Sequence, residues 1–167
     1  ARDVSNHDLE SGQFNQRTEN QINQYPELQA ITWIDSHGRV RASQAAPTLP
    51  SSQIRVAGEV LKKGETIDTF ELTRDLQQPV YTQPLARSGD AAPLLQLQVP
   101  LNVQGKFGGV VLGEYSIDSL LRYGTPTEVL ARYAVTLLDS KNQVLAGTAL
   151  GPRNKATQLL PWTPKAN

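Results

Sequence analysis

The 167-residue chain contains no cysteine, which excludes disulfide bonds, thiolate metal sites and cysteine nucleophiles together. It contains no methionine either, and we interpret this as a sign that the chain is a piece of a longer protein. No stretch approaches the roughly 18 apolar residues that a membrane-spanning helix needs, and no signal peptide is visible. If the parent protein is membrane-anchored, we expect its anchors outside this chain.

The chain also lacks an excess of charge of either sign. Lysine plus arginine total 16 and aspartate plus glutamate total 16, so the net charge is zero. Nucleic-acid-binding proteins usually carry a basic excess or a basic stripe, because phosphate neutralisation dominates their affinity. The longest basic run is Lys62-Lys63. We therefore do not expect a nucleic acid partner.

Catalytic and metal-binding motifs are scarce. The two histidines are His7, in a polar lead-in, and His37, in a predicted turn, and no Gly-x-Ser-x-Gly motif accompanies them. The glycines between 105 and 113 lack the Lys-Ser/Thr ending of a phosphate-binding loop. We expect no enzymatic activity, no metal and no cofactor in this chain.

The N-terminal half of the sequence predicts a helix, a hairpin and a second helix. Residues 1–24 are polar and predict either an N-terminal stalk helix or a solvated lead-in. Residues 28–35 and 39–43, separated by a turn at Gly38, predict a β-hairpin. The apolar spacing over 53–63 predicts a short helix ended by Gly64. Residues 67–72 then predict a strand or a loop.

The C-terminal half predicts further strands at 80–85, 94–103 and 107–115. In 94–103 the alternation places leucine and valine on one face of the strand, and Gln96 and Gln98 on the other. A helical segment over 117–130 is interrupted at Gly124 and Pro126. This order predicts an α+β fold: an antiparallel sheet of about five strands with helices on one face, preceded by the N-terminal helix.

Residues 31–43 (ITWIDSHGRVRAS) are echoed by residues 135–147 (VTLLDSKNQVLAG) at a constant offset of 104. Both segments have the form of an apolar strand, an Asp-Ser turn and a returning strand. One interpretation is that any β-hairpin looks like this. The other is that two modules of one fold follow in tandem. On that basis we predict a stalk helix over 1–24, a sensor module over 25–128 and the start of a second, truncated module over 129–167.

Several segments together resemble a known family. They are the polar N-terminus, residues 25–40 (YPELQAITWIDSHGRV), 79–84 before 97–101, 107–121 (FGGVVLGEYSIDSLL) and 132–146 (RYAVTLLDSKNQVLA). The chain resembles the periplasmic sensor region of membrane-bound bacterial sensor histidine kinases, of the PAS-like double-module (Cache) type. Some relatives are similar to C4-dicarboxylate sensors.

The resemblance implies a signal receptor whose small-molecule ligand lies between the sheet and a covering loop-helix segment. It implies a parent protein anchored in the inner membrane, with this portion in the periplasm and any kinase activity elsewhere. A complete second module would continue past residue 167.

Polar residues on the predicted sheet are the candidate ligand contacts, and Arg74 and Arg87 in flanking loops could hold a carboxylate bidentately. Tyr81 is favoured because a buried tyrosine hydroxyl needs a partner. Each candidate could equally be a solvent-facing residue on an open sheet. The alternative function is a ligand-free domain that forms a homodimer or binds another protein through residues 1–24. The candidates on the sheet are Tyr81, Gln83, Gln96, Gln98, Glu114 and Tyr115.

Overall fold

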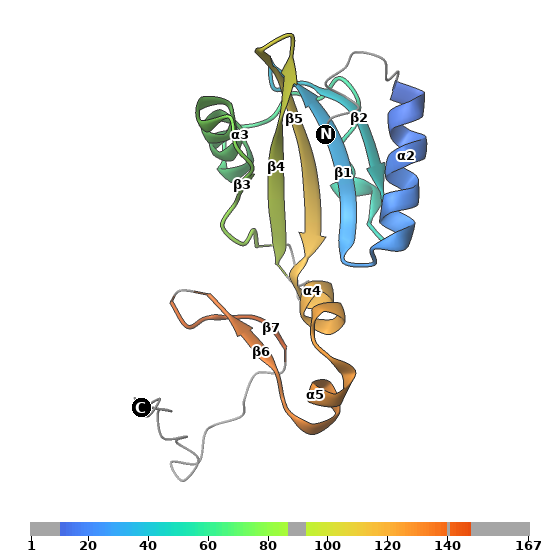
Figure 1. The fold of residues 1–167 in the computed structure, drawn as a ribbon, viewed down its shortest axis with the longest axis vertical. Helices are drawn as coiled ribbons and strands as arrows, with labels where there is room; N and C mark the ends of the chain where they lie inside the picture. Colours follow the sequence, from blue (N-terminus) through green and yellow to red (C-terminus); the bar gives the residue numbers. More distant parts are fainter. Residues whose placement is uncertain (1–10, 87–92, 140, 148–167) are drawn as a thin grey trace, which may run out of the picture.

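The computed structural model describes residues 11–86, 93–139 and 141–147 (Figure 1). Within them lies a five-stranded antiparallel sheet in the order β2-β1-β5-β4-β3. The predicted α+β, PAS-like architecture is therefore confirmed. The strands are β1 (Leu28–Asp35), β2 (Val40–Ala45), β3 (Val80–Tyr81), β4 (Leu94–Val103) and β5 (Lys106–Ser116).

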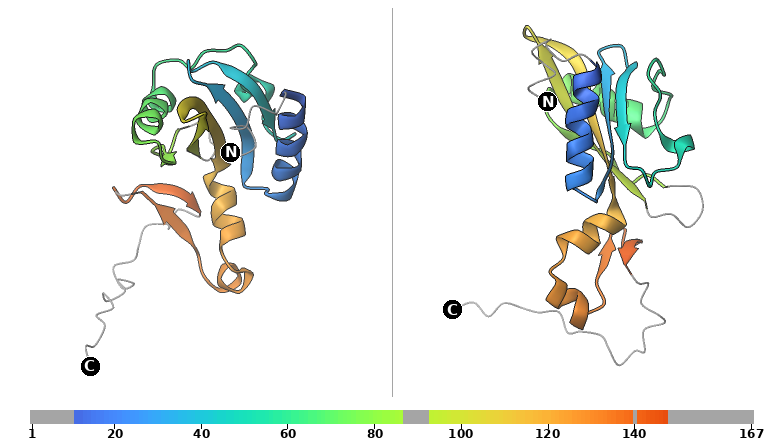
Figure 2. Two further views of the ribbon diagram at one scale, coloured as in Figure 1. Left: turned by 45° about the horizontal axis from the view of Figure 1, so that its top comes forward. Right: turned by 90° about the vertical axis from the view of Figure 1, so that its right-hand side faces the viewer.

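Helices and loops cover both faces of this sheet. Helix α2 (Ser11–Gln24) packs on one face, over β1 and β2, whereas α3 (Glu65–Leu76) lies on the other face together with the loop 46–64 (Figure 2). We call these two faces the α2 face and the α3 face. The sequence predicted the N-terminal helix but not that it would lie on the face opposite α3.

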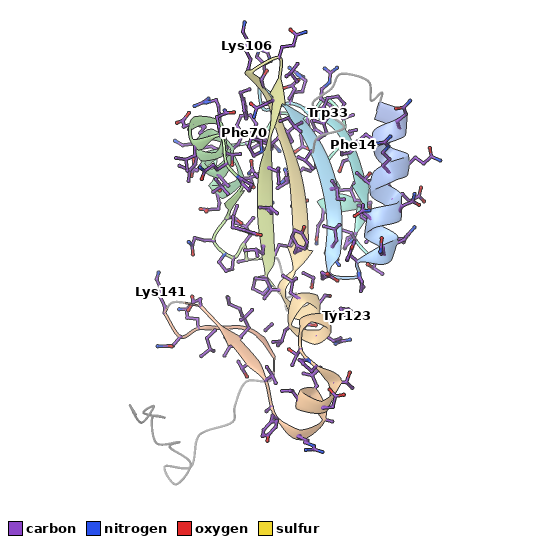
Figure 3. All side chains as sticks on the ribbon, viewed as in Figure 1. Phe14, Trp33, Phe70, Lys106, Tyr123 and Lys141 are labelled. Carbon is purple, nitrogen blue, oxygen red and sulfur yellow. The ribbon has the colours of Figure 1, made fainter. Side chains whose placement is uncertain are left out.

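Two apolar clusters fill the two faces. On the α2 face, Phe14 of α2 packs against Trp33 of β1, with ring centroids 6.1 Å apart (Figure 3). On the α3 face, Phe70 of α3 meets Phe107 edge to face at 5.5 Å. The strand alternation separates the clusters, because successive side chains point to opposite faces. The central pair β1–β5 lies so close at Gly109 that a Cβ there would clash with the carbonyl of Ile34.

The predicted helix over 53–63 is wrong. Only Ser51–Gln53 forms a single 3-10 turn, and the segment that follows hydrogen-bonds to β2, with the Val40 N–H donating to the Glu59 carbonyl at 2.8 Å. The spacing of Ile54, Ala57, Val60 and Leu61 misled because Ala57 and Val60 are exposed and mark no buried face. Gly64 begins the next helix rather than ending one, and residues 67–72 are helical.

The chain leaves the sheet through two short helices, α4 (Ile117–Gly124) and α5 (Thr127–Arg132), interrupted between Gly124 and Pro126 as predicted. The Ser116 hydroxyl caps α4 by accepting the Ser119 N–H at 3.2 Å. A hairpin of β6 (Thr136–Leu138) and β7 (Val144–Gly147) follows beside α4. Over the three described ranges, no helix is long and apolar enough to cross a membrane.

The β6–β7 hairpin repeats the β1–β2 hairpin in its register. Thr32, Trp33 and Ile34 face Ser43, Ala42 and Val40, with a bulge after Trp33. The residues 104 positions later pair identically, with the bulge at the same place. The corresponding partners are Thr136 with Gly147, Leu137 with Ala146 and Leu138 with Val144.

The two turns also match in their hydrogen bonds. The Asp35 carboxylate accepts the backbone N–H groups of residues 37 and 39 at 2.9 and 3.0 Å. The Asp139 carboxylate accepts those of residues 141 and 143, both at 2.8 Å. Gly38 and Asn142 occupy the same turn position with positive φ angles of 74° and 60°. The hairpin is therefore repeated in detail, although Val40 is 1% exposed and its counterpart Val144 is 49% exposed.

Candidate functional site

Two buried glutamines of β4 lie at the centre of a polar group on the α3 face. Gln96 and Gln98 are 1% and 0% exposed. Gln96 stands opposite Glu114 in the β4–β5 register, and its Nε2 donates to Glu114 Oε1 at 2.7 Å. A buried amide and a buried carboxylate are costly unless each finds a partner. This pairing explains how both are tolerated inside the domain.

The first turn of α3 closes over these side chains. Thr66 Oγ1 donates to Gln96 Oε1 at 2.9 Å, and Gln98 Nε2 donates to the Thr66 carbonyl at 2.8 Å. The backbone N–H of Gln96 donates to Thr82 Oγ1 at 3.1 Å. The position of α3 on the sheet is thus fixed by polar contacts as well as by Phe70.

Arg55 brings a positive charge to this group from the loop 46–64. Its Nη2 lies 3.6 Å from Glu114 Oε1, and the two side chains are 20% and 8% exposed. Two polar atoms here have no hydrogen-bond partner in the described structure: Arg55 Nε, a donor, and Gln98 Oε1, an acceptor. We call Arg55, Thr66, Gln96, Gln98 and Glu114 the buried polar cluster.

A cleft of about 360 Å³ opens beside the buried polar cluster, which contributes Arg55 and Thr66 to its wall. Arginine and lysine side chains outnumber carboxylates there, and the N-terminus of α3 adds its partial positive charge. This electrostatic setting suits a small anion. The lining residues are Arg55, Glu59, Leu61, Lys62, Lys63, Gly64, Glu65, Thr66, Leu85 and Ala86.

Three of the predicted candidates, Gln96, Gln98 and Glu114, come together in the buried polar cluster. Tyr81 lies on the other side of the sheet, because it faces Leu97 in the β3–β4 register, and it is 60% exposed. Tyr115 also lies on the α2 face, opposite Leu95. A ligand in the cleft would therefore not contact both sets of candidates.

The remaining candidates lie apart from the buried polar cluster. Arg74, in the last turn of α3, is exposed and pairs with Asp75 at 3.0 Å. Gln83 is exposed, and its backbone N–H donates to the Glu65 carboxylate at 3.2 Å. Arg87 lies outside the described residues. A ligand contact by any of the eight candidates stays a prediction.

Sequence reasoning missed Arg55 and Thr66. The sequence offered one signal, an arginine between the apolar residues Ile54 and Val56. The incorrect helix over 53–63 made Arg55 look like an ordinary surface residue of that helix. Metal coordination has no candidate residues within the described ranges, which contain no group of three or more histidine, cysteine or acidic side chains placed to hold an ion.

No family model and no curated protein matches the chain. Solved structures do match in fold. The ligand-binding domain of the Campylobacter jejuni chemoreceptor Tlp3, in complex with 4-methylisoleucine, aligns with a TM-score of 0.56 and 16% identity over 81% of this chain and 48% of that one. The ligand-binding domain of the amino acid chemoreceptor PctC of Pseudomonas aeruginosa PAO1, in complex with GABA, gives 0.51 and 12% over 84% and 58%.

An extracellular ligand binding receptor from Desulfohalobium retbaense gives a TM-score of 0.52 and 21% identity over 70% of this chain and 20% of that one. The chain thus spans between a fifth and about six tenths of the length of these structures. At these identities the likeness concerns the fold. The chain has the PAS-like fold of extracellular ligand-binding sensor domains, and the fold expected from the sequence resemblance is confirmed.

Proposed function

We propose that this chain is the extracytoplasmic ligand-sensing domain of a bacterial signal-transduction receptor, and that it binds a small molecule in the cleft beside the buried polar cluster. The observation that carries the proposal is the cluster itself. Arg55 Nε and Gln98 Oε1 are buried without partners, and such groups call for an explanation in a folded protein. Arg55 lines the cleft, and a ligand that offers an acceptor there would satisfy its Nε.

The ligand we favour is a small carboxylate. Arg55 presents a guanidinium at the wall of the cleft, and guanidinium recognises carboxylates through paired hydrogen bonds. GABA and 4-methylisoleucine, with which two of the similar chemoreceptor domains were solved, are both carboxylates. These ligands support the chemical class, not a particular compound.

Signalling would proceed by a shift between two conformations that hold the ligand with different affinity. Catalysis, whether by a histidine kinase or another output, would belong to other parts of the parent protein. The extracellular domain of one protein described as a histidine kinase also has this fold. This domain would lie in the periplasm, and its parent would be anchored in the inner membrane.

The β6–β7 hairpin would begin a second, truncated module of the same fold. Its register and turn match those of β1–β2, but Leu138 is 46% exposed whereas its counterpart Ile34 is fully buried. In a complete module a strand equivalent to β5 would pair with β6 on the side opposite β7. In a longer chain that continues past residue 167, slow hydrogen exchange at Leu137 and Leu138 would support this. Fast exchange there would contradict it.

The test of the sensor function is a thermal-shift screen against small organic acids, amino acids and amines, followed by calorimetric titration. A ligand at ~100 times its Kd raises the free energy of unfolding by about 2.7 kcal/mol when it binds only the folded state. We expect an acid to bind and Arg55→Ala to weaken it by ~10-fold or more, because charged hydrogen bonds contribute about 1.5–3 kcal/mol.

Arg122→Ala is the matched control, because Arg122 is an exposed arginine on α4 that neither lines the cleft nor belongs to the predicted ligand contacts. It should leave the affinity unchanged. Equal losses in both variants, or no ligand across the panel, would count against the cleft. Homodimerisation through residues 1–24 stays a prediction, and sedimentation of the free and ligand-bound chain would measure it.

A further inference from the structure

A second cavity lies on the α2 face, on the opposite side of the sheet from the buried polar cluster. Helix α2 covers β1 and β2 and leaves the neighbouring surface of β4 and β5 open (Figures 1 and 2). Between the end of α2 and these strands is a groove of about 450 Å³. It is lined by Gln21, Tyr25, Glu27, Leu28, Ile31, Leu97, Val99, Val111, Gly113 and Tyr115.

Gly113 leaves room for the Tyr115 ring at the floor of the groove. It stands between Ile31 of β1 and Leu97 of β4 in the sheet register. A Cβ at this position would come within 3.1 Å of the Tyr115 ring, which leans back over the glycine. The floor is thus formed by aliphatic side chains, and one aromatic ring lies over its centre.

The groove carries one charge, and that charge is negative. Glu27 is the single ionisable acid or base among the lining residues apart from the tyrosines. Its side chain is half-buried, and in the described part of the chain its carboxylate has neither a hydrogen bond nor an ion pair. The pKa of Tyr115 is raised, first by burial and then by the nearby Tyr81 and Glu27. A ligand in this groove would therefore lie beside a negative charge in a mostly apolar environment.

We propose that this groove binds a small organic cation with an apolar body, such as an alkylammonium ion. Its charged head would lie between the Glu27 carboxylate and the faces of the Tyr25 and Tyr115 rings, where cations are attracted by the ring quadrupole. Its alkyl body would cover Leu97 and Val99, which are only half-buried. The site is independent of the carboxylate cleft, because the two lie on opposite faces of the sheet.

Titration of the intact chain with butyltrimethylammonium chloride tests this site, with n-butanol and sodium butyrate as the neutral and anionic probes of the same alkyl length. The amide NMR signals of Gly113 and Tyr115 should shift with the cation. We expect the cation to bind ~10-fold more tightly than butanol, with an affinity that falls as salt is raised. Glu27→Gln should remove this preference, whereas Glu71→Gln, which changes an exposed carboxylate on α3, should not.

Equal binding of butanol and the cation, or an unchanged preference in Glu27→Gln, would overturn the proposal. So would a dimer in sedimentation that excludes the cation and dissociates in Leu97→Asp, since the groove would then be an interface between two copies. Arg55→Ala should retain cation binding. Loss of the carboxylate in that variant with retention of the cation separates this site from the sensing cleft.

Discussion

At the residue scale, Gln98 and its neighbour Gln96 differ in how completely they are hydrogen-bonded. Both ends of the Gln96 amide are bonded, to Thr66 and Glu114. Gln98 makes one bond and leaves its oxygen without a partner. The fold therefore depends on the first amide much more than on the second, and a buried polar group that the fold does not require is a candidate for function.

We expect Gln98→Leu to change the free energy of unfolding by no more than about 1 kcal/mol, because it removes an unpaired acceptor together with one bond. Gln96→Leu should cost about 1–3 kcal/mol, since it leaves the buried Glu114 carboxylate without its donor. Urea unfolding measures both variants. If Gln98→Leu proves the more damaging of the two, then its oxygen has a partner in solution.

Tyr115 should make stability depend on pH in alkaline solution. Burial, with Tyr81 and Glu27 nearby, raises its pKa above the ordinary value of 10.0. The unfolded chain then loses the tyrosine proton at a lower pH than the folded chain does. The free energy of unfolding should consequently fall as the pH rises from about 10 through the folded pKa.

Tyr115→Phe should make this alkaline decline shallower, as measured by thermal unfolding at a series of pH values. Tyr123→Phe is the control, because Tyr123 is exposed on α4 (Figure 3). An identical decline in wild type and Tyr115→Phe would show that Tyr115 is not responsible.

The alternation of β4 predicted correctly that Gln96 and Gln98 share a face. The side of the sheet on which Tyr81 lies could not be predicted, because β3 is two residues long and only its pairing with Gln98 and Leu97 fixes its orientation. Arg55 was missed because its contact with Glu114 joins a loop to a distant strand. Local patterns hold information about faces of a strand, and little about which distant segments meet.

At the element scale, the start of α3 depends on Gly64. This residue precedes the helix with φ 144° and ψ −174°, a conformation that is essentially confined to glycine. The sequence pattern assigned Gly64 to the end of a helix, because a glycine marks a helix terminus without saying which one. The strands with clear alternation and turns, such as 28–35 and 94–103, were predicted correctly, whereas the strand predicted over 80–85 is confined to Val80–Tyr81.

Gly64→Ala should lower the free energy of unfolding by about 1–3 kcal/mol through backbone strain. Gly12→Ala, in the first turn of α2 with no atom near its would-be Cβ, should instead stabilise the chain by up to about 1 kcal/mol. Chemical denaturation compares the two variants. A Gly64→Ala chain as stable as wild type would mean that α3 can begin with a different backbone.

At the scale of the whole molecule, β5 connects the buried polar cluster to the C-terminal part. Glu114 belongs to the cluster, and two residues later Ser116 caps α4, which lies beside β7. A ligand that draws Arg55 away from Glu114 would act close to this cap. This contiguity is a structural basis for coupling, and coupling itself has to be measured.

We expect ligand binding in the cleft to change the hydrogen exchange rate of the Ser119 amide, which the Ser116 hydroxyl accepts. The Asn142 amide, in the outer turn of β6–β7, serves as the distant reference. A change confined to the loop 46–64 and α3 would show that the signal does not leave the sheet through β5.

Four of the five strands form two local hairpins, β1–β2 and β4–β5, which meet along the β1–β5 pair. That pair joins residues far apart in the chain, Ala30 with Glu114 and Asp35 with Gly109. Closing so long a loop is slow compared with forming a hairpin. We therefore expect the encounter of these two hairpins to limit the refolding rate, and the close approach at Gly109 admits no side chain between them.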